Sequence, residues 1–142
     1  MDPNHLRQLL ERVQAGNASV EEALRELGDL PYKDLGFARV DHHRHLRTGF
    51  PEVVLGLGKS AEQIGQIMVE LERTGANVLA TRVDEAHVEA VLKLVPAARH
   101  EKLARAVVVE QQAIADRGRG TVLIVSAGTS DLPVAEEAAL TA

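Results

Sequence analysis

The densest group of chemically versatile side chains lies between Asp41 and Gly49. Three histidines and two arginines fall within seven residues, namely His42, His43, Arg44, His45 and Arg47. Arg44 and Arg47 are three residues apart, so on a helical turn they share one face. Paired guanidinium groups suit bidentate contact with phosphate. The spacing therefore predicts a phosphate or substrate contact at Arg44 and Arg47.

The same cluster allows two other interpretations. Asp41 and His45 are spaced i, i+4, which would suit an acid–base or metal-binding pair. No third ligand follows at a recognisable spacing, so we predict no metal site. The plainest interpretation is a solvated polar turn with one or two salt bridges.

A second candidate is the loop Gly56–Ala61, with the sequence GLGKSA. It fails the P-loop pattern because Val53 stands where that pattern requires glycine. It satisfies the loose dinucleotide fingerprint G-x-G-x-x-A, and Asp84 is a plausible acidic partner. A simpler account is that Ser60 caps the following helix with Gln63 in a capping box. Free amides at that helix start, beside Lys59, would still favour an anion, so Lys59 is a candidate ligand contact.

The third candidate is a turn of small residues, SAGTSD at 126–131. It follows an apolar, β-branched run, Thr121–Val125, which predicts a buried strand. Asp131 could then cap a helix whose apolar side carries Val134, Ala135, Ala138 and Ala139. Strand, turn and helix in this order are typical of the start of a doubly wound domain, which binds ligands beyond the carboxyl end of its strands. The candidate binding residues are Ser126, Gly128, Thr129, Ser130 and Asp131.

The elements that would position these residues follow from periodicity and capping. Two short amphipathic helices, carrying Leu6, Leu9, Leu10, Val13 and then Val20, Ala23, Leu24, Leu27, predict a helical hairpin. Strands are predicted at Gly36–Val40, Val53–Leu55, Asn77–Val83 and Arg105–Glu110. Two amphipathic helices are predicted between the last three strands. The first faces inward with Ile64, Ile67, Met68 and Leu71. The second is capped by Asp84 and faces inward with Val88, Val91, Leu92 and Val95. His87, in the first turn of that second helix, is expected on the surface.

This order predicts an α/β fold. We expect a helical hairpin arm at residues 1–35, a small N-terminal α/β domain at 36–115, and the first strand-turn-helix of a doubly wound, flavodoxin-like domain at 121–142. That last domain would be incomplete in this chain.

Composition narrows the functional class. The chain has 142 residues, is 45% hydrophobic and 26% charged, and carries a net charge of −5 with no cysteine. The negative charge argues against a nucleic-acid binder. The absence of cysteine is compatible with a reducing cytoplasm. No apolar run reaches the ~18 residues of a membrane span, so we expect a cytoplasmic protein without a membrane partner.

Two phrases resemble a known family. The ending Ser130-Asp131 of a small-residue turn after a strand is similar to the turn of the aminoimidazole ribonucleotide (AIR) carboxylase-like family that helps hold a ribose phosphate. Gly128 stands where the purine-pathway enzymes usually carry serine. With that departure, SAGTSDLPVAEEAALTA resembles a sister group, which makes the nickel-pincer nucleotide cofactor of lactate racemase. The upstream phrase DLGFARVDHHRHLRTGFPEVVLGLGKS resembles the N-terminal region of the same group.

The resemblance implies carboxylation of the pyridinium ring of nicotinic acid adenine dinucleotide and hydrolysis of its phosphoanhydride. The products would be pyridinium-3,5-biscarboxylic acid mononucleotide and AMP. Carbon dioxide would be the co-substrate, and a divalent ion such as Mg²⁺ would help to neutralise the phosphates. The catalytic residues are expected beyond Ala142, and the full-length enzyme is expected to be a homo-oligomer.

Three other functions compete with this one. The first is a true AIR carboxylase of purine synthesis, against which Gly128 and the long N-terminal region count. The second is a non-catalytic nucleotide-binding or assembly module. The third is a nicotinamide-dinucleotide oxidoreductase, which rests on the Gly56–Ala61 match alone.

Overall fold

The computed structural model describes residues 3–28, 30–50, 52–114 and 118–142. The helices are α1 (Pro3–Gln14), α2 (Val20–Glu26), α3 (Arg44–Thr48), α4 (Ala61–Glu72), α5 (Glu85–Leu94) and α6 (Leu132–Thr141). The strands are β1 (Tyr32–Asp34), β2 (Arg39–Asp41), β3 (Val53–Leu55), β4 (Val78–Thr81), β5 (Arg99–Glu101) and β6 (Ala106–Val109). Within these residues, no helix combines the length and the apolar character needed to cross a bilayer.

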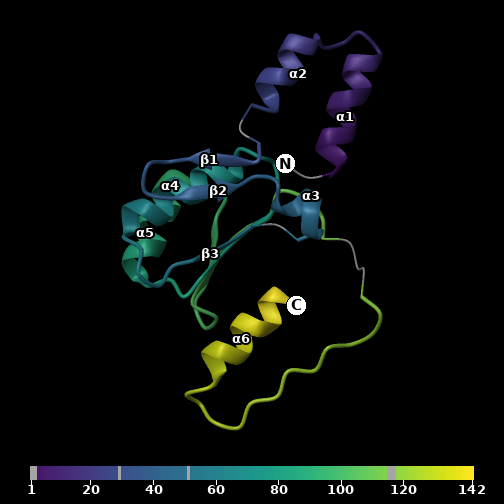
Figure 1. The fold of residues 1–142 in the computed structure, drawn as a ribbon. Coiled ribbons are helices and arrows are strands. Elements are labelled where there is room, and N and C mark those ends of the chain that lie inside the picture. The colour runs from purple at the N-terminus through teal and green to yellow at the C-terminus, as the bar shows by residue number, and fades with distance from the viewer. Residues whose placement is uncertain (1–2, 29, 51, 115–117) are drawn as a thin grey trace.

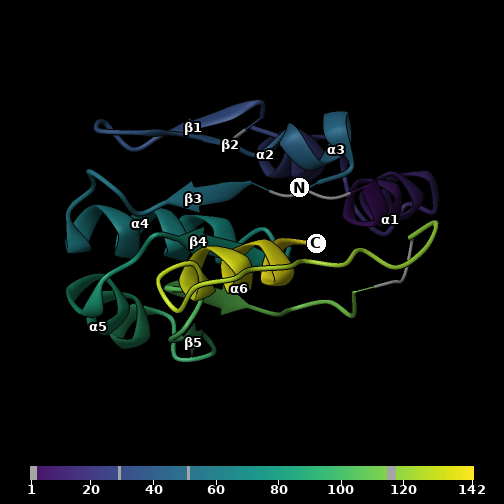
Figure 2. The ribbon, with the colours of Figure 1, turned by 90° about the horizontal axis from the view of Figure 1, so that it is seen from below.

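The main sheet has the strand order β3-β4-β6-β5. β3 and β4 are parallel and are joined through α4, whereas β6 runs antiparallel to β4 and to β5. Figures 1 and 2 show this sheet beside α4 and α5, with the β1–β2 hairpin as a separate two-stranded ribbon. The mixture of sheet and helices confirms the predicted α/β fold.

The core lies between the sheet and the pair α4–α5. The predicted stripe of α4 is buried, with Ile64 and Met68 at 0% exposure. Capping boxes begin both helices: Ser60 with Gln63 for α4, and Asp84 with His87 for α5. These caps satisfy amides that have no partner inside the helix. The sequence prediction for both helix starts is confirmed.

Two helices of the core approach each other closely at a glycine. A Cβ added at Gly65 of α4 would lie 2.8 Å from Cδ1 of Leu94 on α5. Leu92, which was predicted to face inward, is 39% exposed. The buried contacts of α5 are instead made by Val88 and Val91.

The helical hairpin forms as predicted, and Ser19 and Glu22 make its capping box. Its burial differs from the prediction, because Leu10, Val20 and Leu24 are more than half exposed. Figure 1 shows α1 and α2 standing above the body, so much of their surface faces solvent. Leu9 is the buried residue of α1 and Ala23 that of α2.

The remaining strands depart from the sequence prediction. The strand expected at Gly36–Val40 begins later than predicted, because the chain bends at Gly36, with φ 84°, and β2 spans Arg39–Asp41. β2 pairs with β1, which the sequence did not predict. β5 was also missed, because Arg99-His100-Glu101 has no apolar alternation and is a strand only through its pairing with β6.

Thr121–Val125 does not form the predicted strand. The segment is irregular, and Val122, Leu123 and Val125 are 72%, 81% and 80% exposed. The described residues place no strand beside it, and an apolar run becomes a strand only when its backbone is paired. α6 forms as predicted, but no residue of α6 is buried and the Asp131 side chain makes no capping hydrogen bond.

Candidate functional site

The polar cluster at 41–47 sits on the end of β2 and on α3. Gly49, in the left-handed conformation at φ 73°, ends this short helix. Both predicted arginines lie on α3, and each faces a carboxylate of the same chain. The Arg47 Nη2 donates to Asp41 Oδ2 over 2.8 Å, and the Arg44 Nε lies 3.8 Å from Glu52 Oε2. Their phosphate-binding role stays a prediction.

The two carboxylates of this cluster have opposite electrostatic environments. Burial disfavours ionisation of Asp41, but hydrogen bonds from Arg47 and from the His43 amide outweigh it, so the pKa of Asp41 lies below its usual range. Burial raises the pKa of Glu52, with a contribution from the charge of Asp41, although Arg44 and Arg47 oppose the change. Pairs of carboxyl groups whose pKa values diverge are typical of acid–base sites.

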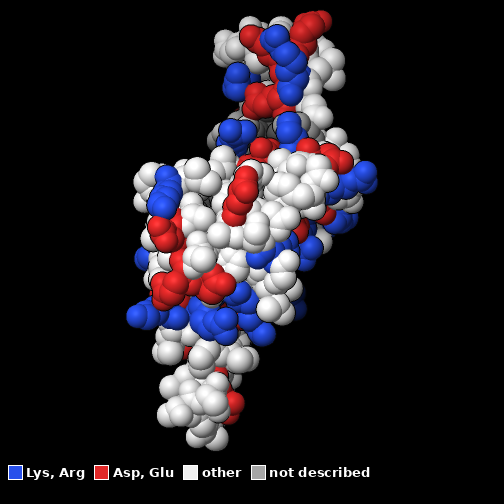
Figure 3. Space-filling model, turned by 90° about the vertical axis from the view of Figure 1, so that its left-hand side faces the viewer, with Lys and Arg blue, Asp and Glu red and all other residues white. Residues whose placement is uncertain are grey.

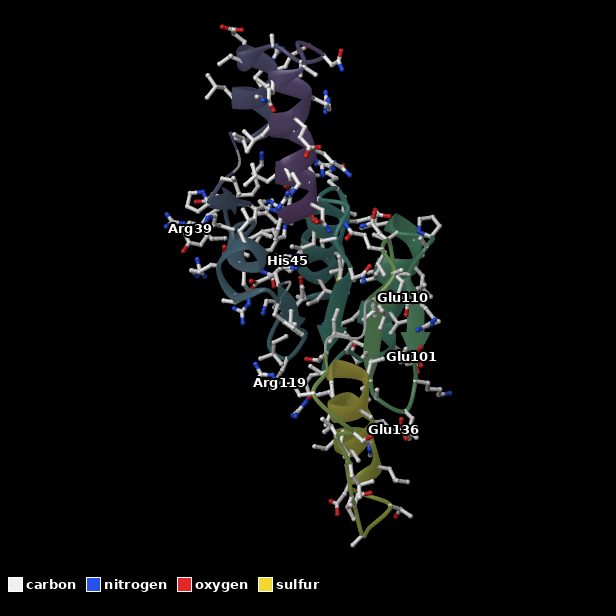
Figure 4. The ribbon with its side chains drawn as sticks, turned by 90° about the vertical axis from the view of Figure 1, so that its right-hand side faces the viewer. Arg39, His45, Glu101, Glu110, Arg119 and Glu136 are labelled. Carbon is white, nitrogen blue, oxygen red and sulfur yellow. The ribbon has the colours of Figure 1, made fainter. Side chains whose placement is uncertain are left out.

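A small, partly open cavity lies between these groups. It measures about 20 Å³, and Asp41, His42, His45 and Glu52 supply most of its polar lining. Asp41 and His45, the predicted i, i+4 pair, therefore meet at one cavity. Figure 4 labels His45, which lies on α3 between the helical hairpin and the sheet. A cavity of this size holds about one water molecule, so it cannot admit a substrate.

Two polar atoms at this cavity have no hydrogen-bond partner among the described residues. They are Nδ1 of His45 and Oε2 of Glu52. Buried polar atoms normally find a partner. A proton on Glu52 would turn an unpaired acceptor into a donor, which agrees with the raised pKa of this group.

A buried contact joins this cluster to α4. His42 and Glu70 are 5% and 7% exposed, and the His42 Nε2 lies 3.2 Å from Glu70 Oε1. The Arg73 Nη1 donates to the other oxygen of Glu70 over 3.3 Å. Sequence reasoning missed Glu70 and Glu52. Glu70 could have been found from its position three residues after Ile67, which places it beside the apolar stripe of the predicted helix. A charged side chain at such a position is seldom buried unless it has a partner.

The Gly56–Ala61 loop lies between β3 and α4, and its polar groups are largely occupied. The Gly56 amide donates to Thr81, the Lys59 amide to Gly56, and the Ser60 amide to Gln63 Oε1. The Lys59 Nζ donates to the Leu55 carbonyl over 2.8 Å. This loop packs against β4, since a Cβ at Gly56 would meet the Arg82 carbonyl oxygen at 2.8 Å.

His87 was expected on the surface, and that prediction is wrong because the residue is 7% exposed. Its Nδ1 lies 3.0 Å from the Asp84 amide and its Nε2 lies 2.8 Å from the Lys59 carbonyl oxygen. The ring therefore ties the loop before α4 to the start of α5. Asp84, the proposed acidic partner of the dinucleotide fingerprint, accepts from the His87 amide as a helix cap.

The turn at 126–131 is separate from the α3 cluster. Ser126, Thr129, Ser130 and Asp131 are exposed, and Gly128 is half-buried. Figure 1 shows α3 at mid-height beside the body and the turn before α6 at the lower end of the molecule, so the structure does not bring the two predicted groups together. α6 is tied to the body by the Arg82 Nε, which donates to Glu137 Oε2 over 2.7 Å.

The charge distribution sets this end of the chain apart. In Figure 3 the hairpin and the body carry mixed acidic and basic residues, and the lower end of the molecule is almost free of charge. In the sequence, Asp131 is the single charged residue between Gly120 and Ala135. The turn is thus a mostly exposed segment whose one charged side chain is the Asp131 carboxylate.

Comparison with known proteins assigns a family. The model of the LarB/PurE-like N-terminal domain matches residues 32–112, more than half of the chain. The chain belongs to this family, which is AIR carboxylase-like.

An uncharacterized protein of Methanocaldococcus jannaschii is 30% identical over 145 aligned residues. The alignment covers 94% of this chain and 55% of that relative, so the chain spans about half the length of the curated protein it matches.

Proposed function

We propose that this chain is the N-terminal part of an AIR carboxylase-like enzyme that acts on nicotinic acid adenine dinucleotide. The match of residues 32–112 to the LarB/PurE-like N-terminal domain is the observation that carries the proposal. The turn of small residues at 126–131, ending in Ser130-Asp131 directly before α6, supports it, because such turns hold ribose phosphates in the family it resembles.

The proposed reaction joins carbon dioxide to a carbon of the pyridinium ring. A C–C bond forms, the ring C–H bond breaks, and its proton is released. One water molecule adds across the phosphoanhydride, and pyridinium-3,5-biscarboxylic acid mononucleotide and AMP are the products. The net reaction consumes no oxidant or reductant.

The described residues offer no set of three or more histidine, aspartate or glutamate side chains that could hold a metal ion. The Mg²⁺ implied by the resemblance therefore has no ligand set on this part of the chain.

Within this proposal, Ser126, Gly128, Thr129, Ser130 and Asp131 contact the ribose phosphate. Arg44, Arg47 and Lys59 are further phosphate contacts. For Arg44 and Arg47 this requires the guanidinium groups to share or leave Glu52 and Asp41, which is feasible because both arginine side chains are about half exposed.

The test is turnover by the full-length enzyme with ¹³C-bicarbonate, followed by mass spectrometry. We expect labelled biscarboxylated mononucleotide and AMP in equal amounts from nicotinic acid adenine dinucleotide. Carboxylation of aminoimidazole ribonucleotide in its place would assign the purine-pathway reaction. Binding of nucleotide without turnover would assign a non-catalytic module.

A further inference from the structure

Two arginines are neighbours where β4 ends and β6 begins. β4 and β6 are paired, and the Val83 amide, directly after Arg82, donates to the Arg105 carbonyl oxygen over 3.0 Å. Arg82 and Arg105 are both exposed, and neither is among the site residues predicted from the sequence. This end of the main sheet thus presents two guanidinium groups from adjacent strand ends.

The backbone at both arginines is in the left-handed region, with φ 55° at Arg82 and φ 51° at Arg105. Within the described residues, these are the two non-glycine positions with positive φ. A side chain there strains the backbone, and strained residues cluster at functional sites. Glycine would adopt this conformation at little cost, so the fold alone does not explain an arginine at either position.

Arg82 already contacts an anionic group from another part of the chain. Its Nε donates to Glu137 Oε2 over 2.7 Å. Figure 1 shows α6, which carries Glu137, just below the body, and no residue of α6 is buried. The contact therefore shows that a carboxylate fits against Arg82, on a helix with little packing to hold it there.

Two other cations at this end of the sheet have donors to spare. Arg105 and Lys102 form no ion pair within the described residues. They lie on one turn, because the Arg105 amide donates to the Lys102 carbonyl oxygen over 3.2 Å. A guanidinium has five N–H groups, whereas a carboxylate has two oxygens. Glu137 therefore leaves most of these donors available to a ligand.

Asp84 is a further carboxylate near Arg105. The hydrogen bond from the His87 amide is the main cause that lowers the pKa of Asp84, and the charge of Arg105 adds to it. Asp84 is the N-cap of α5 and is held there by the His87 amide. It offsets one of the three positive charges. Glu137 belongs to α6, so it is the carboxylate that a ligand could displace.

We propose that Arg82 and Arg105 bind a diphosphate group, and that Glu137 occupies part of this site in the present structure. A diphosphate supplies one phosphoryl group for each guanidinium, and guanidinium–phosphate contacts of this kind are strong and bidentate. Binding displaces the Glu137 carboxylate and releases α6 from Arg82. The site goes beyond the carboxylase proposal and does not depend on it, because binding is measured without turnover.

The experiment is isothermal titration calorimetry of this chain with inorganic pyrophosphate at constant ionic strength. Orthophosphate, with one phosphoryl group, and acetate, with a carboxylate, are the comparison anions. We expect pyrophosphate to bind more tightly than either by about tenfold or more, and Arg82→Gln and Arg105→Gln each to weaken its binding by about tenfold or more, as for loss of charge-assisted hydrogen bonds. Absence of pyrophosphate binding, or equal affinity for the three anions, would overturn the proposal.

Glu137→Gln tests the role of α6, and Glu136→Gln is its matched control. Glu136 is exposed and adjacent to Glu137 on α6, so both variants remove one negative charge from the same helix. Glu137→Gln should bind pyrophosphate about two- to sixfold more tightly, because an exposed ion pair favours the docked helix by only a small factor. Glu136→Gln should bind as the wild type does. Equal tightening by both variants would show a net-charge effect and contradict occupation of the site by Glu137.

Arg82→Gly and Arg105→Gly separate binding from folding. Glycine relieves the left-handed backbone, so both variants should keep or raise the melting temperature while they lose pyrophosphate binding. Wild-type affinity in either variant would overturn the proposal. Loss of binding together with a lowered melting temperature would assign the arginines to the fold, which also counts against it.

Discussion

At the scale of single residues, the most informative feature is the pair of carboxyl groups at one small cavity. Asp41 is held ionised by Arg47 and a backbone amide, whereas Glu52 is half-buried and its Oε2 has no hydrogen-bond partner among the described residues. Sequence spacing found Asp41 and His45. It did not find Glu52, because the three-dimensional return of the chain after α3 brings that residue to the cavity.

We predict that Glu52→Gln stabilises the chain at pH 7. The folded pKa of Glu52 is raised above its ordinary value of 4.5. The stabilising contribution of its protonated form is therefore complete below pH 4.5 and is lost as the pH rises through the folded pKa. Glutamine cannot ionise, so the variant should have the higher melting temperature at pH 7, and the difference should shrink towards pH 4.

Glu89→Gln is the control for this experiment. A hydrogen bond from Lys93 lowers the pKa of Glu89, so ionisation of Glu89 favours the folded state, opposite to the effect at Glu52. Glu89→Gln should therefore be no more stable than the wild type at pH 7. A lower melting temperature for Glu52→Gln at pH 7 would contradict the assignment of Glu52 as a group that favours its proton.

A second residue-scale prediction concerns Asp131. Its side chain makes no capping bond to α6. Asp131→Asn should therefore leave the melting temperature unchanged, and in the full-length enzyme it should reduce turnover, because asparagine lacks the charge. Normal turnover by the asparagine variant would show that Asp131 has no role at the ribose phosphate.

At the scale of elements, the predictable parts were those whose signals are local. α4 and α5 combine a capping residue, an apolar stripe and a clear end, and all three were readable in the sequence. The predictions for β5 and for Thr121–Val125 failed in opposite ways. The first has no strand pattern and is a strand because β6 pairs with it, and the second has the pattern but no paired neighbour.

Charged side chains give β5 a distinct role at the edge of the sheet. Arg99 lies 2.6 Å from Glu101 and 2.9 Å from Glu110. Figure 4 shows Glu101 and Glu110 near each other on this side of the molecule. Charged residues on an edge strand discourage pairing with another sheet.

The junction between β3 and α4 gives a stability prediction. A Cβ at position 56 would lie 2.8 Å from the Arg82 carbonyl oxygen and 3.0 Å from that of Thr81. Both are backbone atoms that cannot rotate away. We expect Gly56→Ala to destabilise the fold by about 1–3 kcal/mol, the range for overpacking.

Chemical denaturation measures this change, with Leu57→Ala as the neighbouring control. Leu57 is 69% exposed, so its truncation should change the free energy of unfolding by less than about 0.5 kcal/mol. Equal effects of the two substitutions would mean that the close approach at Gly56 does not constrain the fold.

At the scale of the whole molecule, the two groups of site residues lie on different parts of the structure. The N-terminal α/β body was predictable because its elements alternate along the chain. The separation of the 126–131 turn from α3 could not be predicted, because no local sequence signal determines where the chain runs between β6 and α6.

We predict that this chain alone does not carboxylate nicotinic acid adenine dinucleotide. The turn at 126–131 is exposed, and the crevice of a doubly wound fold needs several paired strands around it. The assay is the same mass-spectrometric measurement used for the full-length enzyme. Product formation well above a buffer blank would contradict this prediction.

The direction of β6 has a consequence for how α6 is held. Because β6 is antiparallel to β4, the chain leaves the sheet near the start of β4, where the Asn77 side chain donates a hydrogen bond to the Gln112 carbonyl oxygen. α6 is bound beyond the other end of β4, where Arg82 contacts Glu137. These points are separated along β4 by roughly 17 Å at 3.3 Å per residue. The 19 residues from 113 to 131 have a contour length of up to ~60 Å.

The described part of this segment, residues 118–131, forms no strand and is exposed over most of its length. It therefore offers little packing that would hold α6 in one orientation. Water reaches the Arg82–Glu137 ion pair and weakens it, so it is a weak hold on α6 that a competing partner of modest affinity could displace.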